Sequence, residues 1–84
     1  MATVLGPGRY VFGEDIPLGK YTIKAVAGTG AVTAKLPDGE ELFKSFYAEE
    51  GSSYYGLTLL EGEALHINGS LQVEIEKSMP PVIE

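Results

Sequence analysis

The chain has 84 residues and a mass of 9.0 kDa, which is the size of one small domain. Twelve acidic and six basic residues give a formal net charge of −6, and the scattered basic side chains exclude the concentrated positive face that nucleic-acid binding requires. The absence of cysteine excludes disulfides and thiolate metal sites. A core this small leaves no room for a large internal cavity, so we expect function at the surface.

The sequence shows neither a membrane span nor a secretion signal. No apolar run is long enough to cross a bilayer, and residues 1–8 lack the basic start and apolar core of a signal peptide. We therefore expect a soluble protein that does not insert into membranes and stays where it is synthesised. If Met1 is instead a start codon placed before a trimmed secreted domain, the protein is extracellular, and the sequence leaves both origins open.

The first part of the chain predicts an extended arm and a hairpin. Residues 1–7 form the arm, in which Thr3-Val4-Leu5 either pairs with the edge of its own sheet or reaches a neighbouring subunit. Two β-type runs follow, at residues 10–12 and 21–25, and Ile16-Pro17-Leu18-Gly19 separates them. Proline presets φ for the first central position of a type I turn, and glycine can adopt the left-handed conformation that follows. This segment therefore predicts a hairpin.

Similar turn chemistry recurs at Leu36-Pro37-Asp38-Gly39, at Leu59-Leu60-Glu61-Gly62 and at Asn68-Gly69. The segments between these turns alternate as strands do; they are Val32–Leu36, Tyr54–Leu60, Ala64–Ile67 and Leu71–Glu76. In the last of them, the apolar side chains point one way and the polar ones the other, which is typical of a half-buried sheet. The pattern predicts a single all-β domain over residues 1–84, a small antiparallel β-sandwich or flattened barrel of about seven short strands linked by tight hairpins.

Residues 38–50 are compatible with two secondary structures. A helix would begin with Asp38 as its N-cap, gather the apolar side chains on one stripe and end at Gly51. A strand would instead return along Val32–Leu36 and pair that segment with Glu41–Tyr47. We favour the strand, because the Pro-Asp-Gly turn matches the other predicted hairpin turns.

Five of the eight aromatic residues lie within thirteen positions: Phe43, Phe46, Tyr47, Tyr54 and Tyr55. On a strand, Phe43 and Tyr47 face one way and Phe46 the other, so an aromatic pair can remain on the outer face. Packing in the core or under a loop is one explanation. The other is an interface, since tyrosine and phenylalanine supply large contact area at small entropic cost. On that interpretation Phe43, Tyr47, Tyr54 and Tyr55 are candidate partner-binding residues.

Residues 78–84 form a second extended arm. Its two prolines exclude a helix or an interior strand, whereas Met79, Val82 and Ile83 are too apolar for a solvated tail. These three side chains either fold back over this domain or dock on another chain. In the second case they join the candidate partner-binding residues.

The chain offers no convincing catalytic or metal-binding set. His66 is the only histidine, and its position between apolar residues on a strand predicts that it points away from the core. One imidazole without cysteine favours neither zinc binding nor general-base catalysis. A triad of Ser70, His66 and either Asp15 or Asp38 is no better supported than chance. We therefore expect no catalytic residue, no metal and no cofactor, and a protein that is not an enzyme.

The motif Gly8-x-Tyr10-x-Phe12-Gly13-x-Asp15-Ile16-Pro17-x-Gly19-x-Tyr21 resembles that of a small all-β domain. The domain occurs in uncharacterised, often surface or lipoprotein-like proteins of Gram-positive bacteria and in proteins of their phages. A second similar segment, residues 58–67, extends the resemblance over residues 8–77. The resemblance implies a β-sandwich or flattened barrel and carries over no catalytic or ligand-binding residue. With no signal peptide, it implies a location in the host cytoplasm or the virion.

Together these observations predict a non-enzymatic module for protein–protein contact or assembly, and we expect a homo-oligomer. A phage-encoded accessory protein of the virion suits the resemblance. Two alternatives remain open. One is an inhibitor or ligand-sequestering protein that acts on a host factor, with a small-molecule ligand at a subunit junction. The other is a trimmed extracellular adhesion or carbohydrate-binding module whose tyrosines stack on sugar faces.

Overall fold

The computed structural model describes residues 3–78, which form eight short β-strands and one turn of 3-10 helix. The strands are β1 (Thr3–Leu5), β2 (Gly8–Val11), β3 (Tyr21–Ala27), β4 (Thr29–Lys35), β5 (Glu41–Tyr47), β6 (Ser53–Leu57), β7 (Ala64–Ile67) and β8 (Gln72–Lys77). The helical turn η1 (Ala48–Glu50) lies between β5 and β6. No helix within this part of the chain is long and apolar enough to cross a membrane.

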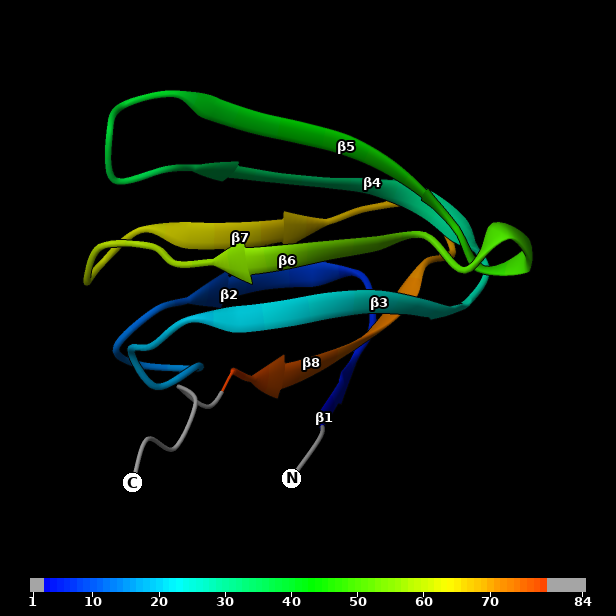
Figure 1. Cartoon of the computed structure of the whole chain (residues 1–84), viewed down its shortest axis with the longest axis horizontal. Helices are drawn as coiled ribbons and strands as arrows, with labels where there is room; N and C mark the ends of the chain where they lie inside the picture. The colour runs from blue at the N-terminus through cyan, green and yellow to red at the C-terminus, as the bar shows by residue number, and fades with distance from the viewer. Residues whose placement is uncertain (1–2, 79–84) are drawn as a thin grey trace, which may run out of the picture.

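The strands form two separate four-stranded antiparallel sheets (Figure 1). Sheet A has the order β1-β8-β3-β6, and sheet B has the order β2-β7-β4-β5. Each sheet therefore has two edges, β1 and β6 in sheet A and β2 and β5 in sheet B. The all-β fold predicted from the sequence is confirmed as a sandwich, and the flattened barrel is not the form observed.

The core lies between the two sheets and takes alternate residues from the strands of both. Its largest fully buried side chains are Phe12, Phe46, Ile23, Leu57, Leu65, Leu71, Val32 and Val73. The rings of Phe12 and Tyr21 meet edge to face, with centroids 5.7 Å apart and an interplanar angle of 84°. In β8 the polar side chains alternate with buried ones, as the sequence predicts.

The chain changes sheet at nearly every connection, which the turn chemistry did not predict. Among the described strands, only β4 and β5 are both consecutive and paired, and the turn at residues 36–39 between them is a hairpin, as expected. The turns at residues 16–19, 59–62 and 68–69 instead carry the chain from one sheet to the other, so the hairpins predicted there are corrected. A turn sequence specifies that the chain reverses direction. It does not specify whether the next strand pairs beside the last one or faces it across the core.

The connection between β2 and β3 shows why the chain leaves sheet B. Phe12 and Ile16 are both buried in the core and form an isolated parallel bridge. The Asp15 carboxylate accepts a hydrogen bond from the Val11 N–H at 2.8 Å, which turns the chain immediately after β2. Phe12 and Ile16 are therefore core residues, and they fill space between the sheets instead of extending one sheet.

The ambiguous segment at residues 38–50 contains a strand, as favoured above. β5 pairs with β4 along its whole length, which confirms the predicted pairing of these two segments. Phe46 is fully buried and Leu42 packs against the core, whereas Phe43 and Ser45 point outward. A single 3-10 turn follows and ends at Gly51, where φ is 66°. Glycine adopts this left-handed conformation without steric strain.

Of the two predicted arms, the structure describes residues 3–7 and Ser78. β1 pairs antiparallel with β8 of the same chain, so residues 3–5 are an edge strand of this domain, which is one of the two pairings left open by the sequence. Beyond β8, the Ser78 N–H donates a hydrogen bond to the Lys20 carbonyl oxygen at 2.7 Å. Met79, Val82 and Ile83, three of the predicted partner-binding residues, lie outside the described residues.

Two glycines near the start of β4 allow the β7–β8 connection to approach closely. The Ala31 N–H donates a hydrogen bond to Oδ1 of Asn68 at 2.7 Å, which holds the two segments together. A Cβ atom at Gly28 would overlap the Ser70 carbonyl oxygen, and one at Gly30 would overlap the Asn68 carbonyl oxygen. The small residues at this position therefore serve the packing of two chain segments.

Candidate binding face

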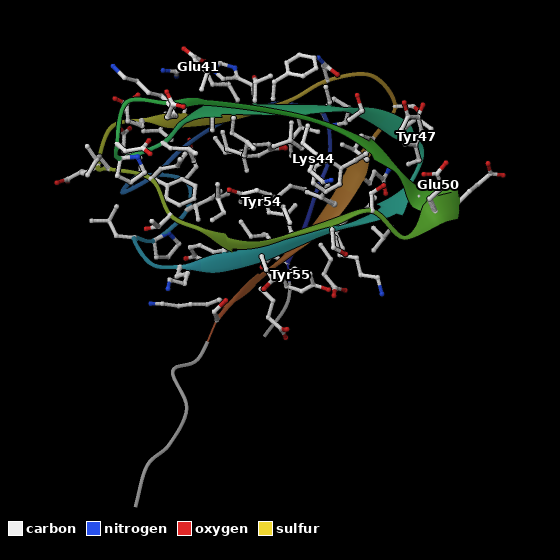
Figure 2. All side chains as sticks on the ribbon, turned by 45° about the horizontal axis from the view of Figure 1, so that its top comes forward. Glu41, Lys44, Tyr47, Glu50, Tyr54 and Tyr55 are labelled. Carbon is white, nitrogen blue, oxygen red and sulfur yellow. The ribbon has the colours of Figure 1, made fainter. Side chains whose placement is uncertain are left out.

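Two of the predicted partner-binding residues share the outer face of sheet B. Phe43 and Tyr47 alternate with core-facing residues along β5, and their side chains are 71% and 44% exposed. Their cross-strand neighbours on β4 are Thr33 and Thr29, whose small side chains leave the rings accessible. Figure 2 shows Tyr47 on the outer side of its sheet. We call Phe43 and Tyr47 the aromatic strip.

The other two described candidates lie on sheet A. Tyr54 is opposite Ile23 in the register and packs against the core. Its neighbour Tyr55 points out of the sheet, as Figure 2 shows, and is 76% exposed. The aromatic residues that are close in sequence are therefore divided among the core and two opposite outer faces. The structure brings together only Phe43 and Tyr47.

The edge strand that carries the aromatic strip has a feature that opposes strand addition. Lys44 lies opposite the fully buried Val32, so its side chain points between the sheets (Figure 2). Its Nζ atom lies 5.6 Å from the centroid of the Phe46 ring. Another strand pairing here would enclose this charge, and an inward-pointing charge is a known protection of sheet edges.

Strand β6, which forms one edge of sheet A, is also irregular. Gly56 has a φ of 79°, and the register between β3 and β6 shifts beside it. Such a bulge interrupts the ladder of backbone groups that an added strand would need. We therefore expect a partner to contact the faces of the sandwich more readily than these two edges.

A row of side chains crosses the outer face of sheet B. Arg9 on β2 is opposite His66 on β7, and His66 is opposite Thr33 on β4. Thr33 is in turn opposite Phe43, so the row ends at the aromatic strip. His66 is exposed, which confirms the prediction that it points away from the core.

An open hollow with a volume of about 300 Å³ lies along this row. Its polar lining consists of Arg9, Thr33, Lys35, Glu41, Glu63 and His66, and we call it the polar hollow. The sequence analysis missed this site because its residues come from four strands and a turn that are far apart in the chain. The only available signal was the outward alternation of single polar residues on separate strands, which is ordinary for a solvated sheet face.

A second hollow, of about 210 Å³, lies where β1 and β8 meet the β2–β3 connection. Leu5, Ile16, Pro17 and Ile75 make its lining mainly apolar. Few polar groups converge there to orient a ligand, so it is a weaker candidate site than the polar hollow.

Three of the side chains considered for a catalytic triad, those of Ser70, Asp15 and Asp38, accept hydrogen bonds from backbone N–H groups. Ser70 Oγ accepts a hydrogen bond from the Thr29 N–H at 3.2 Å. Asp38 Oδ1 accepts one from the Glu40 N–H at 2.9 Å, and Asp15 caps the turn after β2. Among residues 3–78, no group of three or more His, Cys, Asp or Glu side chains is placed so that it could hold a metal ion.

The chain matches no protein-family model, no curated protein and no solved structure. The fold itself defines the class, which is a small all-β domain of two packed sheets. Function therefore has to be argued from the surface of this domain, because a sandwich fold by itself hosts many unrelated functions.

Proposed function

We propose that the protein is a non-enzymatic protein-binding module that self-associates through the outer face of sheet B. The observation that carries this proposal is the aromatic strip, in which Phe43 (71% exposed) and Tyr47 (44% exposed) share one face of β5, with Ser45 between them. Large aromatic side chains left in water on a sheet face are characteristic of contact surfaces, because burying them on association contributes much energy for little lost side-chain entropy.

The charge distribution supports this face over the opposite one. The whole chain carries a net charge of −6, which opposes the approach of two copies. On the outer face of sheet B, however, Arg9 and Lys35 balance Glu41 and Glu63, so acidic charge does not dominate there. On the outer face of sheet A, Glu74 and Glu76 of β8 outnumber Lys24 of β3, which lies opposite Glu74. Two copies therefore meet with less like-charge repulsion through sheet B.

A role as an accessory protein attached to a larger phage assembly is the specific form of this proposal. It is supported by the resemblance of residues 8–21 to a domain found in phage proteins. Self-association through the outer face of sheet B would leave the outer face of sheet A available for attachment.

The test is the native mass measured by light scattering across a concentration series. We expect the wild-type chain to form an oligomer and the double variant Phe43→Ser, Tyr47→Ser to be monomeric with an unchanged circular-dichroism spectrum. The matched control is Tyr55→Ser, which removes an equally exposed aromatic side chain from sheet A and should leave the mass unchanged. A monomeric wild-type protein at all concentrations, or a double variant that keeps the wild-type mass, would overturn the proposal.

A further inference from the structure

The polar hollow is lined by equal numbers of basic and acidic side chains. Two basic residues, Arg9 and Lys35, and two acidic residues, Glu41 and Glu63, line it. The formal charge of this lining is therefore zero, whereas the whole chain carries a formal charge of −6. The hollow also contains the only arginine and the only histidine of the sequence. It is thus electrostatically distinct from the acidic surface around it.

The sheet register explains why these side chains converge. Arg9, His66 and Thr33 lie opposite one another on β2, β7 and β4, and all three point to the outer face. Lys35 and Glu41 form the next outward-facing pair, between β4 and β5. Directly opposite residues on antiparallel strands have their Cβ atoms about 5 Å apart, so the polar groups of neighbouring strands lie within reach of one small molecule.

The lining excludes several ligand classes. A phosphate group or another strong anion would meet two carboxylates beside the basic groups, and its binding would be opposed by them. No group of three metal-ligating side chains is present among residues 3–78, which disfavours a cation bound by the protein alone. A purely apolar molecule would displace water from charged groups without replacing their hydrogen bonds.

An uncharged molecule rich in hydroxyl groups suits all of these side chains. Arginine and lysine donate hydrogen bonds, carboxylates accept them, and the threonine hydroxyl does both. A hydroxyl group is itself both a donor and an acceptor, so a saccharide can satisfy both kinds of partner without burying an unpaired charge. Phe43 follows Thr33 in the cross-strand row and offers an exposed aromatic face beside the polar groups, on which the C–H groups of a sugar ring can pack.

We propose that the polar hollow is a binding site for an uncharged saccharide unit, held by Arg9, His66, Thr33 and the two carboxylates. Its volume of about 300 Å³ lies at the lower end of the range for small-molecule sites, which suits one sugar residue of a longer chain. Both the saccharide site and the proposed self-association use the outer face of sheet B, and Phe43 belongs to both, so a saccharide and a second copy of the chain would compete for this face.

The test is an NMR titration of the full-length, 15N-labelled protein with a panel of neutral mono- and oligosaccharides built from glucose, galactose, mannose and N-acetylglucosamine. Glucuronate and inorganic phosphate serve as charged probes. We expect saturable shifts of the backbone amides of Arg9, Thr33 and His66 with at least one neutral saccharide. We expect weaker or no saturation with the charged probes.

Variants then locate the binding. Thr33→Val keeps the side-chain shape but removes the hydroxyl. The double variant Thr33→Val, Arg9→Gln should weaken saccharide binding at least about tenfold, which corresponds to about 1.4 kcal/mol. Ser45→Ala, on the outer face of β5 but outside the hollow, is the matched control and should bind normally. Circular dichroism checks that each variant is folded.

Three results would overturn the proposal: no saturable shift with any neutral saccharide, tighter binding of phosphate or glucuronate, or shifts confined to sheet A. The native mass of the same samples reports self-association separately. Because a second copy would cover the hollow, the titration is made at concentrations at which light scattering shows a monomer. No binding under those conditions would refute the saccharide site alone, and a wild-type chain that is monomeric at every concentration would refute the proposed self-association alone.

Discussion

Tyr21→Phe tests whether the β2–β3 connection is held to sheet A by a side-chain hydrogen bond. The Tyr21 hydroxyl donates to the Pro17 carbonyl oxygen at 2.6 Å, and the side chain is only 6% exposed. The substitution keeps the ring and its edge-to-face contact with Phe12, so it removes the hydrogen bond and little else. Hydroxyl-to-backbone bonds of this kind, made four residues back along the chain, recur at the corners of β-sandwiches.

The expected loss is about 1 kcal/mol of the free energy of unfolding. Leaving a fully buried carbonyl oxygen without a donor would lower the free energy of unfolding further. This hydrogen bond is only partly buried, so in the variant a water molecule can donate to the Pro17 carbonyl oxygen instead. A domain of this size has a total stability of about 4 to 12 kcal/mol, so the change is readily measurable. It corresponds to a decrease in Tm of about 4–8 °C.

The assay is urea denaturation followed by circular dichroism, with thermal unfolding as a second measurement. Tyr55→Phe removes a hydroxyl from a side chain that is 76% exposed, so it is the matched control and should be neutral. Tyr10→Phe removes a similar bond, from the Tyr10 hydroxyl to the Gly6 carbonyl oxygen at 2.8 Å, and should destabilise by a comparable amount. If Tyr21→Phe is as stable as Tyr55→Phe, the hydrogen bond contributes nothing and the reasoning is refuted.

Two further substitutions test the close packing at β4 and the protection of β5. Gly30→Ala places a methyl group against the Asn68 carbonyl oxygen and should destabilise by about 3 kcal/mol or more in urea denaturation, whereas Gly6→Ala, with open space around it, should be close to neutral. Equal free energies of unfolding for these two variants would contradict the close approach of β4 to the β7–β8 connection. Lys44→Val removes the inward charge from an edge strand and should promote association, seen as a higher mass in light scattering at equal concentration. Lys24→Val, on the interior strand β3, is its control, and the same mass for both variants would speak against edge protection.

The positions of the strands and the directions of most of their side chains follow from local sequence patterns. Strand alternation is a local property with a period of two residues, so the buried and exposed faces of β5 and β8 could be predicted without knowing their partners. The hairpin at residues 36–39 was also predictable, because its proline, aspartate and glycine specify a tight reversal between two alternating segments.

The sheet that each strand joins, and the side chains that meet, depend instead on contacts between distant parts of the chain. Phe12 and Ile16 are in the core because two sheets close over them, and this contact sends the chain from sheet B to sheet A where the turn residues alone suggest a hairpin. In the same way, Arg9 and His66 become neighbours through strand pairing, across more than fifty residues of chain. Such contacts depend on the burial of apolar surface over the whole domain, which no local pattern contains.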